Sequence, residues 1–400
     1  MGENVLLYNP WGYDGGEPTS SDGVIQMSWA DFVGSFEMFA IAYIATGIAA
    51  AASVPWAGRG RDLSMVKSMR FWLTLPLVLM FAAPIAADEA TPEQVRAAVA
   101  KSLPLLTQGA AGHMANRDCF ACHNQHVPML ALTTARQHGF AIDDGEVAKN
   151  TKFINAFLDK NRSNYLQGRG QGGQVDTAGY ALWTLELGGW SGNATTAAVA
   201  EYLLQYHQDA PFWRVTANRP PSEVSNFTAN FLALRALQTF GTSEQQDRIA
   251  RRTRQVRAWL LRTPAKDTED RVFRLWALQQ AGAHPVEVQN AAQQLLQSQR
   301  DGGGWAQTDA MDPDAYATGT ALVALHDAGG LRTEDAIYQR GVRFLLKTQL
   351  DDGSWHIRSR SKPFQLYFES GFPHGKDQFI SLAASGWATT ALALTIAKQP

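Results

Sequence analysis

Apolar residues after position 90 recur at helical spacing, and they do so in pairs of segments. The first segment of each pair is amphipathic, whereas the second is almost wholly apolar and rich in Ala and Leu. Val, Ile and Thr do not alternate with polar residues over any long window, so the pattern predicts an almost entirely helical protein. The amphipathic segments are 151–161, 195–207, 246–262, 286–299 and 335–349, and the apolar segments are 176–185, 228–237, 270–278, 314–325 and 381–394.

A further pair precedes these five. Residues 94–108 form an amphipathic segment, and residues 128–136 form the apolar segment that follows it. The pairs recur about every 40–50 residues, which is the spacing of a repeat architecture. Six helical hairpins are enough to close a ring, so we expect an all-α protein, an α/α toroid of about six helical hairpins. An open solenoid of the same hairpins is the alternative.

The first 90 residues follow a different pattern. Residues 38–57 are nearly all apolar and long enough for a membrane helix. Residues 65–87 have a basic start, an apolar run and a small-residue end at Ala87, as a secretory signal peptide does. Either translation starts near Met65 and residues 1–64 are an upstream segment, or residues 38–57 are a first membrane helix. Membrane association is expected only if residues 38–57 or 71–87 are retained.

Both explanations place the chain after residue 88 on the far side of the membrane. We therefore expect a periplasmic or otherwise exported protein. Its two parts are a first hairpin at residues 88–144 and the remaining repeats at residues 145–400.

The first hairpin contains the motif Cys119-Phe-Ala-Cys122-His123, which includes both cysteines of the chain. This spacing is typical of c-type haem attachment, in which two thioethers hold the porphyrin and the histidine binds the iron. The export signal agrees with this interpretation, because such haem is attached outside the cytoplasm. The sequence therefore predicts one covalent haem c, with His123 as the proximal iron ligand. A chance pair, a reactive dithiol and a fragment of a zinc site are the alternatives.

The sixth iron ligand has three candidates. His374 comes first, because ring closure brings the loop before the last inner helix beside the first hairpin. Met114 and His113 follow, because both are expected in a flexible turn just before the motif. An open sixth position is also possible, and it favours catalysis over electron transfer.

Two segments resemble a known sequence motif. Arg340-Gly-Val-Arg-Phe-Leu-Leu-Lys-Thr-Gln349-Leu-Asp-Asp-Gly353-Ser-Trp355 is similar to the QW motif of the squalene cyclase and prenyltransferase repeat superfamily, and Gln294-Leu-Leu-Gln-Ser-Gln299-Arg-Asp-Gly-Gly-Gly-Trp305 is similar to a second copy. Gly189-Trp190 is interpreted as a remnant of a third. The resemblance covers residues 145–400 and implies an α/α toroid, in which the Gln caps a neighbouring helix and the Trp packs beside it. With its haem motif, the whole chain resembles a bacterial group that joins haem attachment to cyclase-like repeats.

The chemistry of that superfamily is not expected here. Its cationic triterpene cyclases use an Asp-x-Asp-Asp-Thr run whose middle aspartate protonates the substrate, whereas this chain has Asp314-Ala-Tyr316-Ala-Thr318. A tyrosine, with a pKa of about 10, is too weak an acid for that step. Its protein prenyltransferases bind zinc through a cysteine, and both cysteines here belong to the haem motif. We therefore expect neither an active triterpene cyclase nor a protein prenyltransferase.

Several polar residues lie near the starts of the inner helices and are expected at the mouth of a central cavity, although helix capping is an alternative role for each aspartate. They are Asp176, Asp270, Asp312, Asp314, Tyr316 and Gln378. Trp183, Trp276, Phe231 and Trp387 either line this cavity or belong to the core.

The charge of the chain is nearly balanced, with a formal net charge of -2, so nothing in it indicates a nucleic-acid partner. The predicted function is that of an exported c-type cytochrome that transfers electrons to a redox partner protein. One alternative is a haem oxidoreductase that acts on a hydrophobic small-molecule ligand in the toroid cavity. The other is a binding module that senses a ligand or the redox state.

Overall fold

The structure of the protein is a computed structural model, and it describes residues 4–8, 24–28, 90–363 and 365–398. The chain divides into two compact units, Met1–Phe81 and Ala82–Pro400. In the first unit, β1 (Asn4–Tyr8) and β2 (Val24–Ser28) pair antiparallel, with Asn4 opposite Ser28. The sequence pattern predicts no such hairpin. The predicted membrane helix at 38–57 and the predicted signal peptide at 65–87 lie outside the described residues.

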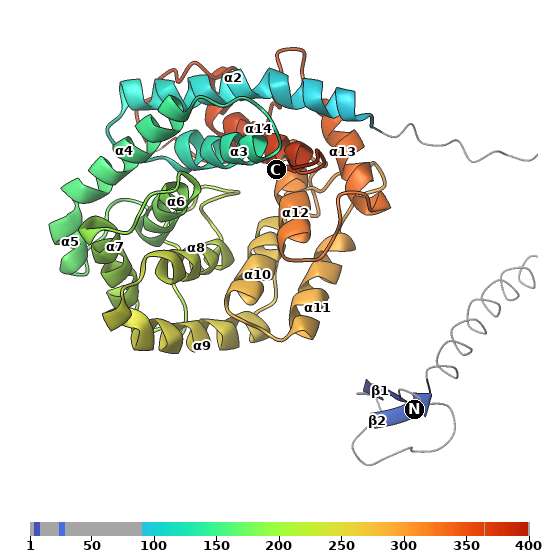
Figure 1. Cartoon of the computed structure of the whole chain (residues 1–400), viewed down its shortest axis with the longest axis horizontal. Coiled ribbons are helices and arrows are strands. Elements are labelled where there is room, and N and C mark those ends of the chain that lie inside the picture. Colours follow the sequence, from blue (N-terminus) through green and yellow to red (C-terminus); the bar gives the residue numbers. More distant parts are fainter. Residues whose placement is uncertain (1–3, 9–23, 29–89, 364, 399–400) are drawn as a thin grey trace, which may run out of the picture. The chain divides into compact units, whose positions relative to one another are not determined.

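The second unit is a ring of inner helices surrounded by outer helices (Figure 1). The inner helices are α3 (Val127–Gln137), α6 (Gln174–Leu187), α8 (Asn226–Phe240), α10 (Thr268–Gln280), α12 (Ala315–Asp327) and α14 (Gln378–Ala393). The outer helices are α2 (Pro92–Asn116), α4 (Asp144–Lys160) with the short α5 (Arg162–Leu166), α7 (Ala194–Gln205), α9 (Gln246–Arg262), α11 (Pro285–Leu296) and α13 (Ala336–Thr348). Three short helical turns complete the unit, η1 (Cys122–His126), η2 (Ser243–Gln245) and η3 (Gly375–Asp377).

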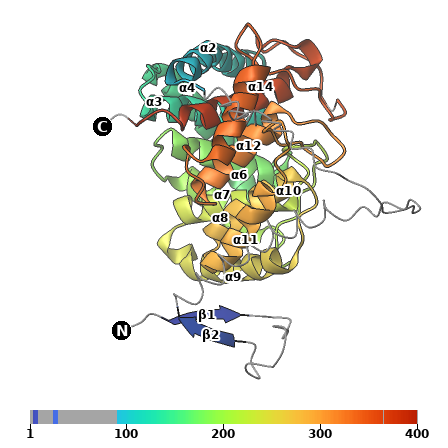
Figure 2. The same cartoon turned by 90° about the vertical axis from the view of Figure 1, so that its right-hand side faces the viewer.

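The ring is closed by contacts between its last hairpin and its first. Helix α14 packs against α3 and α2, while α2 and α9 lie at opposite sides of the ring in both views (Figures 1 and 2). Across the closure, the Thr389 hydroxyl donates a hydrogen bond to Ser102 Oγ over 2.9 Å. The predicted all-α toroid of six hairpins is confirmed, and residues 82–400 form one compact unit.

The difference between inner and outer helices follows from their apolar patterns. Helix α12 buries every residue from Ala315 to Leu325, because it packs on several sides at once. Helix α9 buries one stripe that includes Ile249, Val256 and Leu260, as expected for a helix with one face in water. None of the described helices is both long and apolar enough to span a bilayer.

The two QW segments join neighbouring outer helices. Gln299 Nε2 donates to the carbonyl of Ile337 in α13 over 2.9 Å, and Gln349 Nε2 donates to the carbonyl of Ala98 in α2 over 2.9 Å. The indole Nε1 atoms of Trp305 and Trp355 donate to the carbonyls of Leu295 and Leu345, ten residues earlier in each case. The second of these joints therefore also closes the ring.

A third joint lies at Trp213 and not at the predicted remnant Gly189-Trp190. Trp213 is fully buried, and its Nε1 atom donates to the carbonyl of Leu203 over 2.8 Å, again ten residues earlier. His207 occupies the position of the glutamine. The ten-residue spacing from Leu to Trp is thus the sequence signal that identifies this joint, because the indole hydrogen bond depends on that spacing. A Gly-Trp pair does not by itself imply this hydrogen bond.

The aromatic residues of the inner helices meet in the interior of the ring. Trp183 lies 6.1 Å from Trp276 and 6.5 Å from Trp387 between ring centroids, and Trp276 stacks on Phe231 at 5.3 Å. All four side chains are buried. Of the two roles expected for them, the structure therefore supports the core.

Candidate functional site

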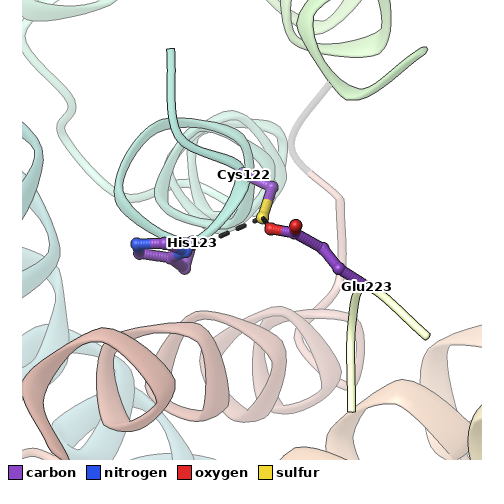
Figure 3. A group of neighbouring side chains, drawn as sticks. All are labelled: Cys122, His123 and Glu223. Carbon is purple, nitrogen blue, oxygen red and sulfur yellow. Dashed lines mark hydrogen bonds between the residues drawn. The ribbon is translucent and has the colours of Figure 1, made fainter. Parts of the chain in front are cut away.

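The Cys-x-x-Cys-His motif lies at the end of the ring where the inner helices begin. Cys119 belongs to the loop after α2, whereas Cys122 and His123 belong to η1, which leads directly into α3. The two cysteines form no disulfide with each other. The Cys122 thiol donates to Glu223 Oε1 over 3.1 Å, and its Sγ atom lies 3.7 Å from His123 Nδ1 (Figure 3).

All three motif residues line one pocket of about 410 Å³. Phe120, Phe157 and Tyr180 provide apolar surface in the same pocket, and His113, Asp176 and Glu223 provide polar groups. A single bound group can therefore touch both thiols, the imidazole and an apolar wall. This donor set fits a covalently attached haem, which needs two thiols and a histidine beside an apolar face.

Burial keeps the imidazoles of this pocket neutral. The pKa of His123 is lowered to about 3, mainly by burial and further by His113 and Arg219. Burial also lowers the pKa of His113, and the charge of Arg117 adds to this effect. The hydrogen bond that His113 donates to the carbonyl of Cys119 opposes it. A neutral imidazole keeps a nitrogen lone pair, which is the form that binds a metal.

The structure adds two residues to the site that the sequence does not indicate, Arg219 and Glu223. Their side chains form an ion pair, and their backbones pair across a tight turn with N–O distances of 3.0 and 3.1 Å. Burial raises the pKa of Glu223, although Arg219 opposes the shift. Burial and Glu223 together raise the pKa of the Cys122 thiol. These residues lie far from the motif in the sequence, and no local pattern marks them.

Asp176 is the predicted cavity residue that joins the motif. This residue is 2% exposed, and neither carboxyl oxygen has a hydrogen-bond partner among the described residues. Burial, and then the charge of Glu223, raise the pKa of this carboxyl well above its usual value. Buried polar atoms in native proteins normally have partners, so the unpaired carboxyl of Asp176 is available to contact a group bound in this pocket.

The other predicted cavity residues line neither this pocket nor the neighbouring one. Asp314 caps α12 by accepting a hydrogen bond from the backbone of Ala317 over 2.9 Å, and Asp270 accepts one from Ser225 over 2.6 Å. Asp312 is exposed. Capping is therefore the role observed for Asp314.

Tyr316 is buried and donates a hydrogen bond to Glu269 Oε2 over 3.2 Å. Thr228 donates to the other oxygen of Glu269 over 3.1 Å. Burial raises the pKa of Glu269 well above its usual value despite these two hydrogen bonds. No sequence pattern marks Glu269 as a buried acid, because an acidic residue in the first turn of a helix is common.

Gln378 is fully buried and holds the loop before α14 in place. Its Oε1 atom accepts hydrogen bonds from the backbone and hydroxyl of Ser370, and its Nε2 atom donates to the carbonyl of Phe368 over 3.1 Å. Gln378 thus positions the loop that lies beside the motif.

The turn predicted before the motif is wrong, because α2 continues to Asn116 and carries His113 and Met114 in its last turn. Gly109 and Gly112 lie within this helix and allow another segment to approach it closely. A Cβ atom on Gly112 would lie 1.8 Å from the carbonyl oxygen of Ser370, and one on Gly109 would lie 2.0 Å from Leu382. Two glycines within a helix therefore let the C-terminal segment pack directly on α2.

The structure separates the three candidates for the sixth iron ligand. His113 lines the same pocket as His123, its Nε2 atom lies 2.7 Å from the carbonyl of Cys119, and its buried Nδ1 atom has no partner among the described residues. Met114 and His374 do not line that pocket. His374 Nε2 lies 2.7 Å from Ser354 Oγ, and its ring stacks on His356 at 4.6 Å.

No protein-family model matches the chain, and no curated protein matches it. Several solved structures are similar to it. A protein from Actinoplanes has 14% identity and a TM-score of 0.49, over 76% of this chain and 100% of that chain. The type II terpene cyclase MstE from Scytonema, without ligand, has 13% identity and a TM-score of 0.47, over 76% of this chain and 98% of its own. A variant of that cyclase in complex with merosterolic acid A has 13% identity and a TM-score of 0.48, over 75% and 96%.

Proposed function

We propose that this chain is an exported c-type cytochrome, with one covalent haem c at the end of an α/α toroid. Cys119 and Cys122 hold the porphyrin by thioethers, and His123 binds the iron. The observation that supports this most strongly is that all three side chains line one pocket with an apolar wall. When bound, haem supplies a one-electron couple, so the proposed role is electron transfer to a redox partner protein.

The residues around the motif suit this role. The ring of Phe379 packs edge-on against His123, with 5.2 Å between ring centroids, and so restricts the orientation of the imidazole. The low pKa of His123 keeps the ring neutral over the physiological range. Arg219 and Glu223 form an ion pair beside the motif, and their charges act more strongly there than in bulk solvent because the surrounding protein has a lower dielectric constant than water.

For the sixth ligand we favour His113 over Met114 and His374. His113 combines a place in the pocket with an unpaired ring nitrogen. His374 is engaged with Ser354 and His356 instead. Two histidines on one haem close the iron to external ligands, which is suited to electron transfer.

The alternative of an oxidoreductase with a hydrophobic ligand in the toroid centre receives less support. Trp183, Trp276 and Trp387 occupy the interior and contact one another. The same packing, together with Tyr316 at the position of the catalytic acid, is the basis for not proposing triterpene cyclase activity. The assignment of both cysteines to the haem motif is the basis for not proposing protein prenyltransferase activity.

One observation favours a second candidate function, a mononuclear metal site. The ligand atoms of Cys122, His123 and Glu223 all lie within 4.8 Å of one another (Figure 3). A thiolate, an imidazole and a carboxylate are a ligand set that Zn²⁺ accepts, with a fourth position left open. Cys119 is not part of this cluster, although haem attachment requires it. A variant at Cys119 therefore distinguishes the metal site from the cytochrome.

The test is an optical spectrum and an intact mass of protein matured in a strain competent for cytochrome c assembly, with metal analysis of the same sample. A cytochrome shows a covalent haem, reduced bands of c type and iron in equal amount to protein. Cys119→Ser is expected to lose one thioether, whereas Glu223→Gln is expected to keep both. A protein with zinc and no haem, whose zinc is lost in Glu223→Gln and retained in Cys119→Ser, would replace the cytochrome with the metal site.

Export is tested on the same sample. We expect the mature protein to begin at Asp88 and to fractionate with the periplasm. Haem-bearing protein that retains residues 38–57 and fractionates with membranes would instead support a membrane anchor.

A further inference from the structure

A second pocket shares a wall with the pocket of the motif. Its volume is about 400 Å³, within the range of about 300–1,000 Å³ that small-molecule sites occupy. His123, Arg219, Glu223 and Gln365 line both pockets. The second pocket extends away from the cysteines, between the turn at 219–223 and residues 359–363 and 365–367, over the start of α14.

The lining of this pocket is apolar with a basic rim. Its apolar residues are Pro220, Pro363, Leu366, Tyr367, Phe379 and Ile380. Its cations include Lys362 and Lys376, which are exposed and have no ion pair among the described residues. Among the described residues of the lining, the acid is Glu223, which is paired with Arg219. We call this second site the lysine pocket.

The walls of the lysine pocket are held by hydrogen bonds from outside it. The carbonyl of Leu366 accepts a hydrogen bond from Arg117 Nη2 over 2.6 Å. The backbone of Ser359 donates to Asp377 Oδ1 over 2.9 Å, and Gln378 fixes the segment at 367–370. The pocket is therefore formed before a ligand arrives, which lowers the free-energy cost of binding.

We propose that the lysine pocket binds a small apolar organic anion. Its charged group lies between Lys362 and Lys376 at the rim, and its apolar part lies on Phe379, Ile380 and Leu366. Burial of the apolar part supplies most of the affinity, whereas the two ammonium groups select an anion over a neutral molecule of the same shape. The inference goes beyond the proposed cytochrome, because none of its contacts requires haem.

Isothermal titration calorimetry of the purified full-length protein tests this proposal with three probes. Octanoate has the apolar chain and the charge, octan-1-ol has the chain alone, and acetate has the charge alone. We expect octanoate to bind at one site at least tenfold more tightly than either control. Acetate binding as tightly as octanoate, or octan-1-ol matching it, would overturn the proposal.

A pair of double variants places the binding site. Lys362→Gln with Lys376→Gln removes both rim charges, and we expect octanoate to bind about tenfold more weakly while octan-1-ol is unaffected. The matched control is Lys152→Gln with Lys266→Gln, which removes the same charge from exposed lysines outside the pocket. Equal effects of the two double variants would show that the binding is non-specific and would refute the site.

The haem content of each sample is read from its absorbance in the same experiment. If the protein carries no haem but binds octanoate, the proposal of the lysine pocket is supported and the proposed cytochrome function is contradicted. A haem-bearing protein that gives no octanoate heat would contradict the lysine pocket alone.

Discussion

The QW joints and the pocket of the motif are both buried, but they differ in how their polar atoms are satisfied. At the joint of Gln349 and Trp355, each side-chain N–H group donates to a carbonyl. In the pocket, Asp176 and one nitrogen of His113 have no hydrogen-bond partner among the described residues. An unsatisfied buried atom costs stability unless a bound group satisfies it. The joints therefore hold the ring, whereas the unpaired groups of the pocket are those that the proposed ligand would satisfy.

Removal of a joint is expected to have the largest effect on stability. Trp355→Ala deletes a side chain that is 1% exposed and breaks the hydrogen bond to Leu345, so we expect a loss of about 3–5 kcal/mol in the free energy of unfolding. Urea denaturation measures this loss. Trp190→Ala is the control, because Trp190 is only partly buried and belongs to no joint. An equal loss in both variants would contradict the role assigned to the joint.

A glycine of the same joint tests the ring closure. Gly353 has a φ of 94°, and a Cβ atom there would lie 2.7 Å from the carbonyl of Lys101 in α2. We expect Gly353→Ala to lower the free energy of unfolding by about 2–4 kcal/mol, from backbone strain and from the overlap. Gly302→Ala is the matched control, since its Cβ meets nothing within 4 Å, and it is expected to change little. Thermal unfolding of both variants tests whether the close contact between Gly353 and α2 stabilises the closed ring.

Asp176 is expected to behave in the opposite way, with its replacement stabilising the haem-free protein. Its raised pKa means that the folded chain keeps a proton that the unfolded chain loses above about pH 3.9. The free energy of unfolding therefore falls as pH rises from there toward the folded pKa. Asp176→Asn removes this fall, and we expect a gain of about 1–3 kcal/mol at pH 8 and little gain at pH 3.

Urea denaturation of haem-free protein at both pH values tests this expectation. The exposed Asp301→Asn serves as the control. A loss of stability at pH 8 in Asp176→Asn would mean that the carboxylate is satisfied in the folded protein, and the contrast with the joints would fail.

The smallest effect is expected at His374. His374→Ala should leave the visible spectrum of the haem-loaded protein unchanged, because this side chain is engaged with Ser354 outside the pocket. His113→Ala should open the iron, so that carbon monoxide shifts the reduced spectrum of this variant alone. A carbon monoxide response in His374→Ala but not in His113→Ala would restore His374 as the sixth ligand.

Much of the ring could be predicted from the sequence. The alternation of amphipathic and apolar segments is a local property, and it predicted the inner and outer helices and the closure by six hairpins. The joints at Trp305 and Trp355 were predicted through a motif, whereas the joint at Trp213 was missed because His207 replaces the glutamine. The turn expected after residue 108 was wrong, because glycine permits both a turn and a close helix contact.

Less of the pocket could be predicted. Cys119, Cys122 and His123 lie close together in the sequence, so their spacing alone predicts haem attachment. Glu223, Arg219 and the lysine pocket come from loops far along the chain, and their positions depend on how the hairpins close.

The sequence by itself thus determined the helices, their order around the ring and the motif, since each depends on residues within one or two turns of one another. Only the tertiary structure decided which polar side chains meet. Of the six candidate cavity residues, only Asp176 lines the pocket of the motif. His113 lines this pocket, whereas His374 contacts Ser354 elsewhere. Tryptophan side chains occupy the interior of the ring. The physical reason is that burial and electrostatic environment depend on neighbours from distant segments, which local spacing does not encode.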